Sequence, residues 1–163
     1  MSREHKYQTK LSWVGAGQGA TSSYNSYSRE YTVEIAGKAP FRGTADPMFR
    51  GDPTLHNPED LLVASLAACH MLTYLALAAR EQILIEAYED TSSGTMILDG
   101  NGGRFQEVTL RPKVIVSKES DIGRATELHE KAHRDCFIAN SVNFPVRHDP
   151  FVHTSFKASF KVP

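Results

Sequence analysis

The segment from Leu61 to Ala79 constrains the fold most, because it contains no Asp, Glu, Lys or Arg. It directly follows Asn57-Pro58-Glu59 and Asp60, a typical helix start: the Asn can cap free backbone N–H groups, and the Pro suits the first helical position. The pattern predicts a helix from this point to about Ala79–Glu81 that is apolar on nearly every side. Such a helix must be buried on most of its faces, which favours a core helix.

A membrane-spanning helix is the alternative, because the uncharged segment reaches the necessary length. However, it carries polar side chains at Ser65, His70, Thr73 and Tyr74, and no second segment resembles it. No apolar stretch follows the first residues, so we expect no secretory signal and no membrane association. The formal net charge of −1 gives no attraction to nucleic acid. We therefore expect a cytoplasmic protein.

Most of the remaining chain alternates polar and apolar residues, as strands do. The expected strands are residues 5–14, 27–36, 40–45, 83–98, 104–117 and 152–162. Gly100-Asn101-Gly102-Gly103 supplies the turn of a long hairpin between the fourth and fifth of these strands. A second helix is expected to begin at Asp121 and to end near Cys136. The order β-β-β-α-β-β-α-β predicts one α+β domain that spans residues 1–163.

The chain has two cysteines, one in each expected helix. Cys69 lies in the apolar helix, and Cys136 closes the second helix. Two cysteines in a chain of this size do not make a disulfide scaffold, but they suit a reducing compartment and a catalytic or regulatory pair. In such a pair, one thiolate attacks and the other thiol resolves the product. The simpler interpretation of Cys69 is a small buried apolar residue.

Three features together resemble the family of osmotically inducible protein C and organic hydroperoxide resistance protein (OsmC/Ohr). Asn57-Pro58-Glu59 is followed by Cys69 ten residues after the Glu, a second cysteine ends a later helix, and Trp13-Val14-Gly15 ends the first expected strand. The resemblance implies antiparallel sheets packed on a long central apolar helix. It also implies that two chains interlock into a homodimer whose central helices pack against each other.

The resemblance further implies a thiol-dependent peroxidase that reduces organic hydroperoxides, and also hydrogen peroxide, without metal or other cofactor. Cys69 would attack the peroxide and become a sulfenic acid, and Cys136 would resolve it to a disulfide that an external dithiol reduces. Glu59 would hold an arginine, which stabilises the thiolate and orients the peroxide.

Two positions depart from the family pattern. Met48 stands where we would align the family's arginine, and Phe137 follows Cys136 where many family members have proline. We expect Arg50 to supply the cation, with Arg42 and Arg29 as further candidates; a solvated loop charge is the other interpretation of Arg50. These departures motivate a second hypothesis, an OsmC-fold binding or stress-related protein without efficient peroxidase activity.

A third hypothesis is metal binding. His129, His133 and Cys136 are spaced to share one helix face, and Cys69-His70 could join them. Imidazole and thiolate are ligands of zinc and copper. The simpler interpretation makes His129 and His133 solvated residues and His70 a contact in the core or in the dimer.

Overall fold

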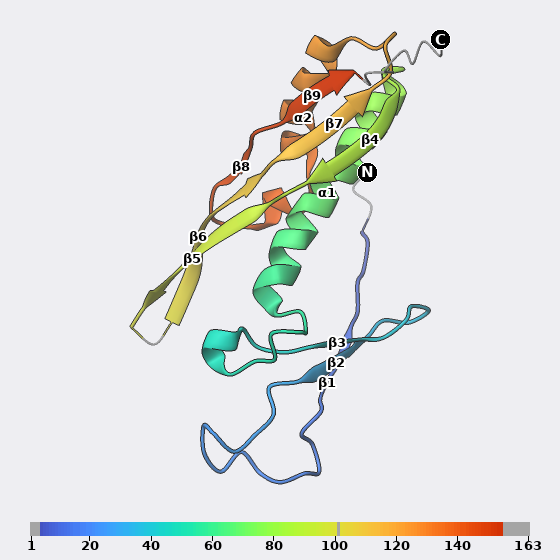
Figure 1. The fold of residues 1–163 in the computed structure, drawn as a ribbon. Coiled ribbons are helices and arrows are strands. Elements are labelled where there is room, and N and C mark those ends of the chain that lie inside the picture. Colours follow the sequence, from blue (N-terminus) through green and yellow to red (C-terminus); the bar gives the residue numbers. More distant parts are fainter. Residues whose placement is uncertain (1–3, 101, 155–163) are drawn as a thin grey trace, which may run out of the picture. The chain divides into compact units, whose positions relative to one another are not determined.

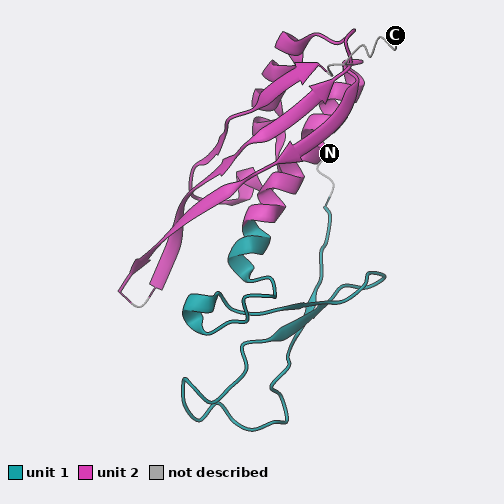
Figure 2. Ribbon diagram, in the orientation of Figure 1, with its two compact units in different colours: residues 1–62 teal, residues 63–163 magenta. Residues whose placement is uncertain are grey.

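The computed structural model describes residues 4–100 and 102–154. They form two compact units, which divide after Leu62 (Figure 2). The boundary falls within the first helix, so Glu59 and Arg50 belong to the first unit, and Cys69 and Cys136 to the second.

The first unit contains an antiparallel sheet with the strand order β1-β2-β3. Its strands are β1 (Lys10–Trp13), β2 (Tyr31–Glu34) and β3 (Phe41–Gly43). All three lie inside segments where the alternating pattern predicts strands. A short 3₁₀ helix, η1 (Pro47–Phe49), follows β3, and Arg50 comes directly after it with a φ angle of 69°.

Helix α1 (Pro58–Arg80) confirms the predicted central helix and its start. The Asn57 side chain accepts a hydrogen bond of 2.7 Å from the backbone N–H of Asp60, as a helix cap does. The helix ends where Gln82 adopts a φ angle of 59° and the N–H of Ile83 bonds back to the carbonyl of Ala78 at 2.9 Å. Four of its buried side chains follow one another at intervals of three or four residues and so share one face, which the adjacent Ala78 extends: Leu66, His70, Tyr74 and Leu77.

The predicted long hairpin is present, but it is divided between two sheets (Figure 1). The inner part pairs β4 (Ile85–Asp90) with β7 (Pro112–Val116), and the outer part pairs β5 (Ser93–Asp99) with β6 (Gly102–Leu110). At the division, the Asp90 carboxylate accepts a 2.8 Å hydrogen bond from the N–H of Arg111, and Pro112 has no N–H to give. A hydrogen bond from the backbone to a side chain thus replaces a backbone–backbone hydrogen bond where the strand pairing is interrupted.

Both sheets are mixed, because each gains a parallel strand from the end of the chain. β8 (Val146–His148) joins β6, and β9 (Phe151–Thr154) joins β7. The sequence pattern did not indicate β8. It did indicate a last strand at residues 152–162; β9 confirms its start, and residues 155–162 lie outside the described part of the chain.

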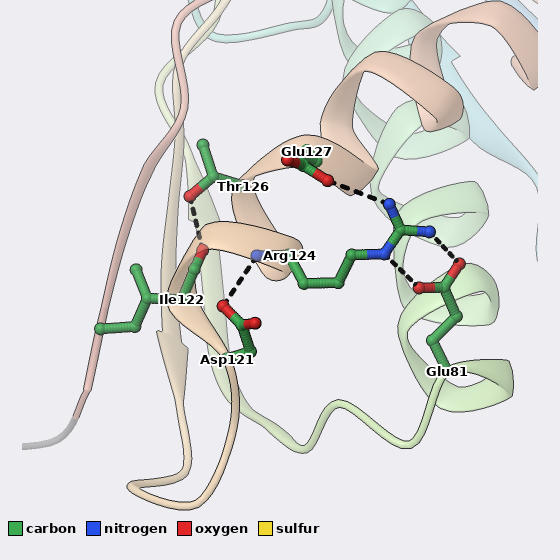
Figure 3. Close-up of polar contacts among 6 residues, drawn as sticks. All are labelled: Glu81, Asp121, Ile122, Arg124, Thr126 and Glu127. Atoms are coloured by element: carbon green, nitrogen blue, oxygen red, sulfur yellow. Dashed lines mark hydrogen bonds and ion pairs between the residues drawn. The ribbon is translucent and has the colours of Figure 1, made fainter.

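Helix α2 (Ile122–Asp135) confirms the second predicted helix, with Asp121 as its cap and Cys136 directly after it. Figure 3 shows the start of this helix and its tie to the end of α1. The Arg124 guanidinium donates to both carboxylate oxygens of Glu81, at 2.6 and 2.9 Å, and also to Glu127 at 3.0 Å. The core of the second unit lies where α1 and α2 pack on the β4-β7-β9 sheet, and its fully buried side chains include Tyr74, Val114, Val116 and Leu128.

Candidate functional site

The two cysteines lie on the two helices of the second unit, and both are free thiols. Cys69 is in the middle of α1 and is partly exposed. Cys136 caps the C-terminus of α2 and is only 1% exposed. Its N–H donates to the carbonyl of His133 at 3.3 Å, and its sulfur accepts from the N–H of Ala139 at 3.4 Å. The first residue of the short helix η2 (Ala139–Ser141) therefore donates the hydrogen bond that this sulfur accepts.

The side chains of Cys69 and Cys136 are neighbours. Burial, and next the hydrogen bond to Cys69, raise the pKa of the Cys136 thiol to about 11. Cys136 is therefore protonated at neutral pH, whereas a nucleophile must be a thiolate. Cys69 is also the more exposed of the two, so a substrate would reach it first. This arrangement suits an attacking Cys69 and a resolving Cys136.

An antiparallel packing of α1 and α2 accounts for this meeting. At one end of the pair, Arg124 bonds to Glu81. In the middle, His129 bonds to His70, and at the other end Cys136 meets Cys69. Residues later in α2 thus contact residues earlier in α1, and two cysteines that are 67 positions apart in the sequence meet at one site.

Glu59 lies in the first turn of α1, in the first unit. Its Oε2 atom is buried without a hydrogen-bond partner in the described chain. The carboxylate lies close enough to β2 that, after burial, its charge is the second cause that raises the pKa of Tyr31. A buried carboxylate oxygen without a donor is costly, so this position suits a cationic partner.

The three candidate arginines differ in how they are engaged. Arg42 is paired with Glu30. Arg29 stacks on aromatic rings, with its guanidinium carbon 3.8 Å from the centre of the Tyr27 ring. Arg50 is exposed, and its side chain has no hydrogen bond or ion pair with any described residue. It lines a hollow of about 220 Å³ in the first unit, which Arg29 also lines. Of the three, Arg50 is the one left free to meet another group.

The sequence did not indicate a cluster of histidines beside the thiols, two of which are fully buried. The Nε2 atom of His70 lies 3.0 Å from the Nδ1 atom of His129, and the two rings are stacked. The ring of His148, on β8, is centred 5.7 Å from His70 and 5.2 Å from His133. The ring of Tyr74 stacks on His129 at 4.0 Å. We call the four imidazoles the histidine cluster.

The expectation that His129 is solvated is wrong, because its side chain is fully buried. His70 is also buried, as the interpretation as a core contact requires. A signal was available: His129 lies on the same face of α2 as Ala125, Leu128 and Ala132, which form its only apolar stripe.

Burial is the first cause of the depressed basicity of the cluster. Together with the neighbouring imidazoles, burial lowers the pKa of His70 to about 4 and that of His129 to about 3. Among residues 4–100 and 102–154, no three His, Cys, Asp or Glu side chains are grouped as ligands of a metal ion. The metal-binding hypothesis therefore has no ready-made site in this region.

Residues 51–150 match the family model described as OsmC-like protein. A curated relative, an uncharacterized protein of Bacillus subtilis (strain 168), is 24% identical over 89 residues, which are 53% of this chain. The match spans 59% of the length of that relative.

Solved structures agree with this match over nearly the whole chain. An OsmC-like protein of unknown function from Vibrio cholerae is 30% identical, with a TM-score of 0.79 over 91% of this chain and 100% of that one. An organic hydroperoxide resistance protein from Elizabethkingia anophelis has the same fold at 19% identity, with a TM-score of 0.68 over 95% and 100% of the two chains. One from Legionella pneumophila does so at 22% identity, with a TM-score of 0.65 over 91% and 98%.

Proposed function

The chain belongs to the OsmC-like protein family, and from this premise we propose that it is a thiol-dependent peroxidase that reduces organic hydroperoxides and also hydrogen peroxide. The observation that carries the proposal is the meeting of Cys69 and Cys136, the only two cysteines in the sequence, at one end of the α1–α2 pair. Two relatives of the same fold are named as organic hydroperoxide resistance proteins, which agrees with this activity.

In the first step, the Cys69 thiolate attacks the terminal oxygen of the hydroperoxide. The O–O bond breaks, a proton neutralises the leaving alkoxide to give an alcohol, and Cys69 becomes a sulfenic acid. In the second step, the sulfur of Cys136 attacks the sulfenic sulfur, and water leaves with the thiol proton. An external dithiol then reduces the disulfide and restores both thiols. The cycle needs no metal or organic cofactor.

Glu59 and Arg50 take the supporting roles in this proposal. The unmatched Oε2 atom of Glu59 and the unengaged guanidinium of Arg50 both belong to the first unit. A carboxylate and a guanidinium make strong paired hydrogen bonds, so Glu59 would hold Arg50 in a fixed direction. Arg50 would then stabilise the Cys69 thiolate and orient the peroxide.

We further propose that residues 1–163 act as one domain within a cytoplasmic homodimer. Helix α1 is long and apolar enough to cross a membrane, with a mean hydropathy of 1.9 in its most apolar stretch. Only 28% of that stretch is buried within the chain, and Leu72 is 62% exposed. A second copy that packs its own α1 against this one would remove the uncovered apolar surface from water. Neither a membrane nor a nucleic acid is part of the proposal.

The proposal is tested by peroxide consumption coupled to the oxidation of dithiothreitol. Wild-type protein should consume cumene hydroperoxide, and the Cys69→Ser variant should not. Hydrogen peroxide in parallel reports the substrate preference. Wild-type consumption no faster than that by free dithiothreitol would contradict the peroxidase.

The second candidate is a binding or stress-related protein of this family without efficient peroxidase activity. The departures at Met48 and Phe137 favour it, because they remove the aligned arginine and the proline after the second cysteine. It predicts that wild-type protein and the Cys69→Ser variant behave alike in the peroxide assay. Metal analysis of the purified protein tests the metal-binding alternative in the same preparation.

A further inference from the structure

Two members of the histidine cluster, His70 and His129, link the two helices that carry the thiols, and His148 joins them from β8. His70 is one residue after Cys69 on α1, and His133 precedes Cys136 by about one turn on α2. The 3.0 Å contact between His70 and His129 is the polar link between the two helices at this level. Whatever separates these two rings therefore also affects the approach of Cys136 to Cys69.

The cluster has little negative charge in contact with it to balance a proton. The other titratable groups in contact with it are Tyr74 on α1, Tyr88 on β4 and Glu130 on α2. Within the described residues, the one carboxylate in contact is Glu130, 3.6 Å from His148, and its side chain is mostly exposed. No carboxylate contacts His70 or His129 in the same region.

A charged imidazole in this place has two costs. It loses hydration without gaining a counter-ion, and it meets the other imidazoles at ring distances of 5 to 6 Å, so that a second proton is repelled. Both costs disappear when the helices part and water enters. Protonation of the cluster is therefore linked to separation of α1 and α2.

We propose that the histidine cluster is an acid-sensitive latch, which holds the Cys136 end of α2 against α1 while it is neutral and releases it when it is protonated. Release takes Cys136 away from Cys69, so acid prevents the two thiols from joining. The latch is a property of the fold and does not depend on which oxidant acts on the thiols.

At the other end of the helix pair, the contact between Arg124 and Glu81 should persist in acid. The pKa of the Glu81 carboxyl is lowered by its hydrogen bonds to Arg124, and the guanidinium keeps its charge at any pH of interest. This ion pair persists at a pH at which imidazoles gain protons. We therefore expect α2 to open from its Cys136 end and to stay tied near Arg124. Protonation therefore favours the open state increasingly as the pH falls below 6.5 toward the buried pKa values of about 4 for His70 and about 3 for His129.

Amide hydrogen exchange of the reduced, full-length protein tests the latch. Exchange is followed at pH 7.5 and at pH 5.0 and corrected for the intrinsic rate at each pH. We expect the amides from His129 to Asp135 to lose protection at least tenfold at pH 5.0, while strands β1 to β3 change less than twofold. Unchanged protection of the second half of α2 would overturn the proposal.

The double variant His70→Phe/His129→Phe supplies the matched comparison, because its rings can stack as the imidazoles do but cannot take protons. It should keep the protection of α2 at pH 5.0, and an equal loss in variant and wild type would overturn the latch. The exposed residue His5 provides the control: His5→Gln should behave as wild type.

Two measurements keep the test decisive if the double variant does not fold. Carbon-13 histidine NMR of wild type should show His70 and His129 gaining protons only as α2 loses protection. Normal titration near pH 6.5 with α2 still protected would contradict the latch.

Diamide, which takes up the two electrons and two protons of the thiol pair, should join Cys69 to Cys136 at pH 5.0 at least tenfold more slowly than loss of thiolate alone accounts for. A rate that follows the thiolate fraction alone would contradict the latch, and neither result depends on peroxidase activity.

Discussion

The Nε2 atom of His70 and the Nδ1 atom of His129 lie 3.0 Å apart, on two different helices and out of reach of solvent. Such a bond needs one N–H donor and one unprotonated nitrogen, so at least one of the two rings is neutral. A second proton would turn two donors toward each other in the core. The stability of the second unit therefore depends on pH through these two residues.

The first prediction concerns the free energy of unfolding below neutral pH. The folded state holds the pKa of His70 at about 4 and that of His129 at about 3, below the ordinary value of 6.5. Because the unfolded chain then binds more protons, the contribution of both histidines is complete above about pH 6.5 and is lost as the pH falls toward about 4 for His70 and about 3 for His129. Each of the two histidines should therefore lower the free energy of unfolding by about 2 kcal/mol when the pH falls to 5. Urea unfolding at pH 7.5, 6.0 and 5.0 measures the effect, which a constant midpoint would contradict.

The second prediction concerns the resolving step. In the Cys136→Ser variant, the sulfenic acid on Cys69 should persist and be trapped by dimedone, whereas in wild type it should give way to a disulfide within one chain. Because burial raises the pKa of the Cys136 thiol, the rate of disulfide formation should keep increasing as the pH rises above neutral, by up to about tenfold for each pH unit. Peptide mapping under non-reducing conditions identifies the bridge. Free thiols after one equivalent of oxidant, or a bridge between chains, would count against this pairing.

Local signals were sufficient to predict both helices. Asn57 caps α1 and Asp121 caps α2, as the capping preferences require, and the strands before α1 lie within the alternating segments. What local patterns cannot report is pairing between distant segments. Strand β8 has three residues and pairs in parallel with β6, so nothing near it in the sequence marks it as a strand.

The candidate site, like the fold, could be predicted from local sequence patterns only in part. The helix that carries each cysteine follows from the sequence, but their meeting depends on the antiparallel packing of α1 and α2, and resemblance rather than pattern suggested it. The burial of His129 also depends on packing, although the stripe of Ala125, Leu128 and Ala132 on α2 signals that this face is covered. A polar residue on an apolar stripe indicates a buried network as readily as a solvated side chain.

The third prediction concerns assembly. Leu72→Glu places a charge on the exposed face of α1 and should convert a homodimer into monomers, because a buried and unpaired carboxylate at the contact is costly. Light scattering at micromolar concentration measures the change. The control is Leu98→Glu at the end of β5, another exposed leucine, which should leave the dimer intact. A wild-type protein that is a stable folded monomer would rule the assembly out.

The fourth prediction concerns the arginine that serves Cys69. Arg50→Ala should slow peroxide attack, because the thiolate loses a charge-assisted hydrogen bond of roughly 1.5–3 kcal/mol, equivalent to about a tenfold to hundredfold change in rate. Glu59→Ala should have a similar but indirect effect, since Arg50 would lose the carboxylate that fixes its direction. Stopped-flow measurement of sulfenic acid formation gives the rate for each variant.

Arg42→Ala and Arg29→Ala are the comparisons, because those guanidinium groups are engaged by Glu30 and by the Tyr27 ring. Both should react nearly as fast as wild type. An unchanged rate in Arg50→Ala with a lost rate in either comparison would assign the cation to another strand of the first unit. If none of the three changes the rate, and wild type reacts no faster than a free thiol, the binding or stress-related function becomes the better account of this chain. The arginine series thus decides between the two proposed functions as well as among the three arginines.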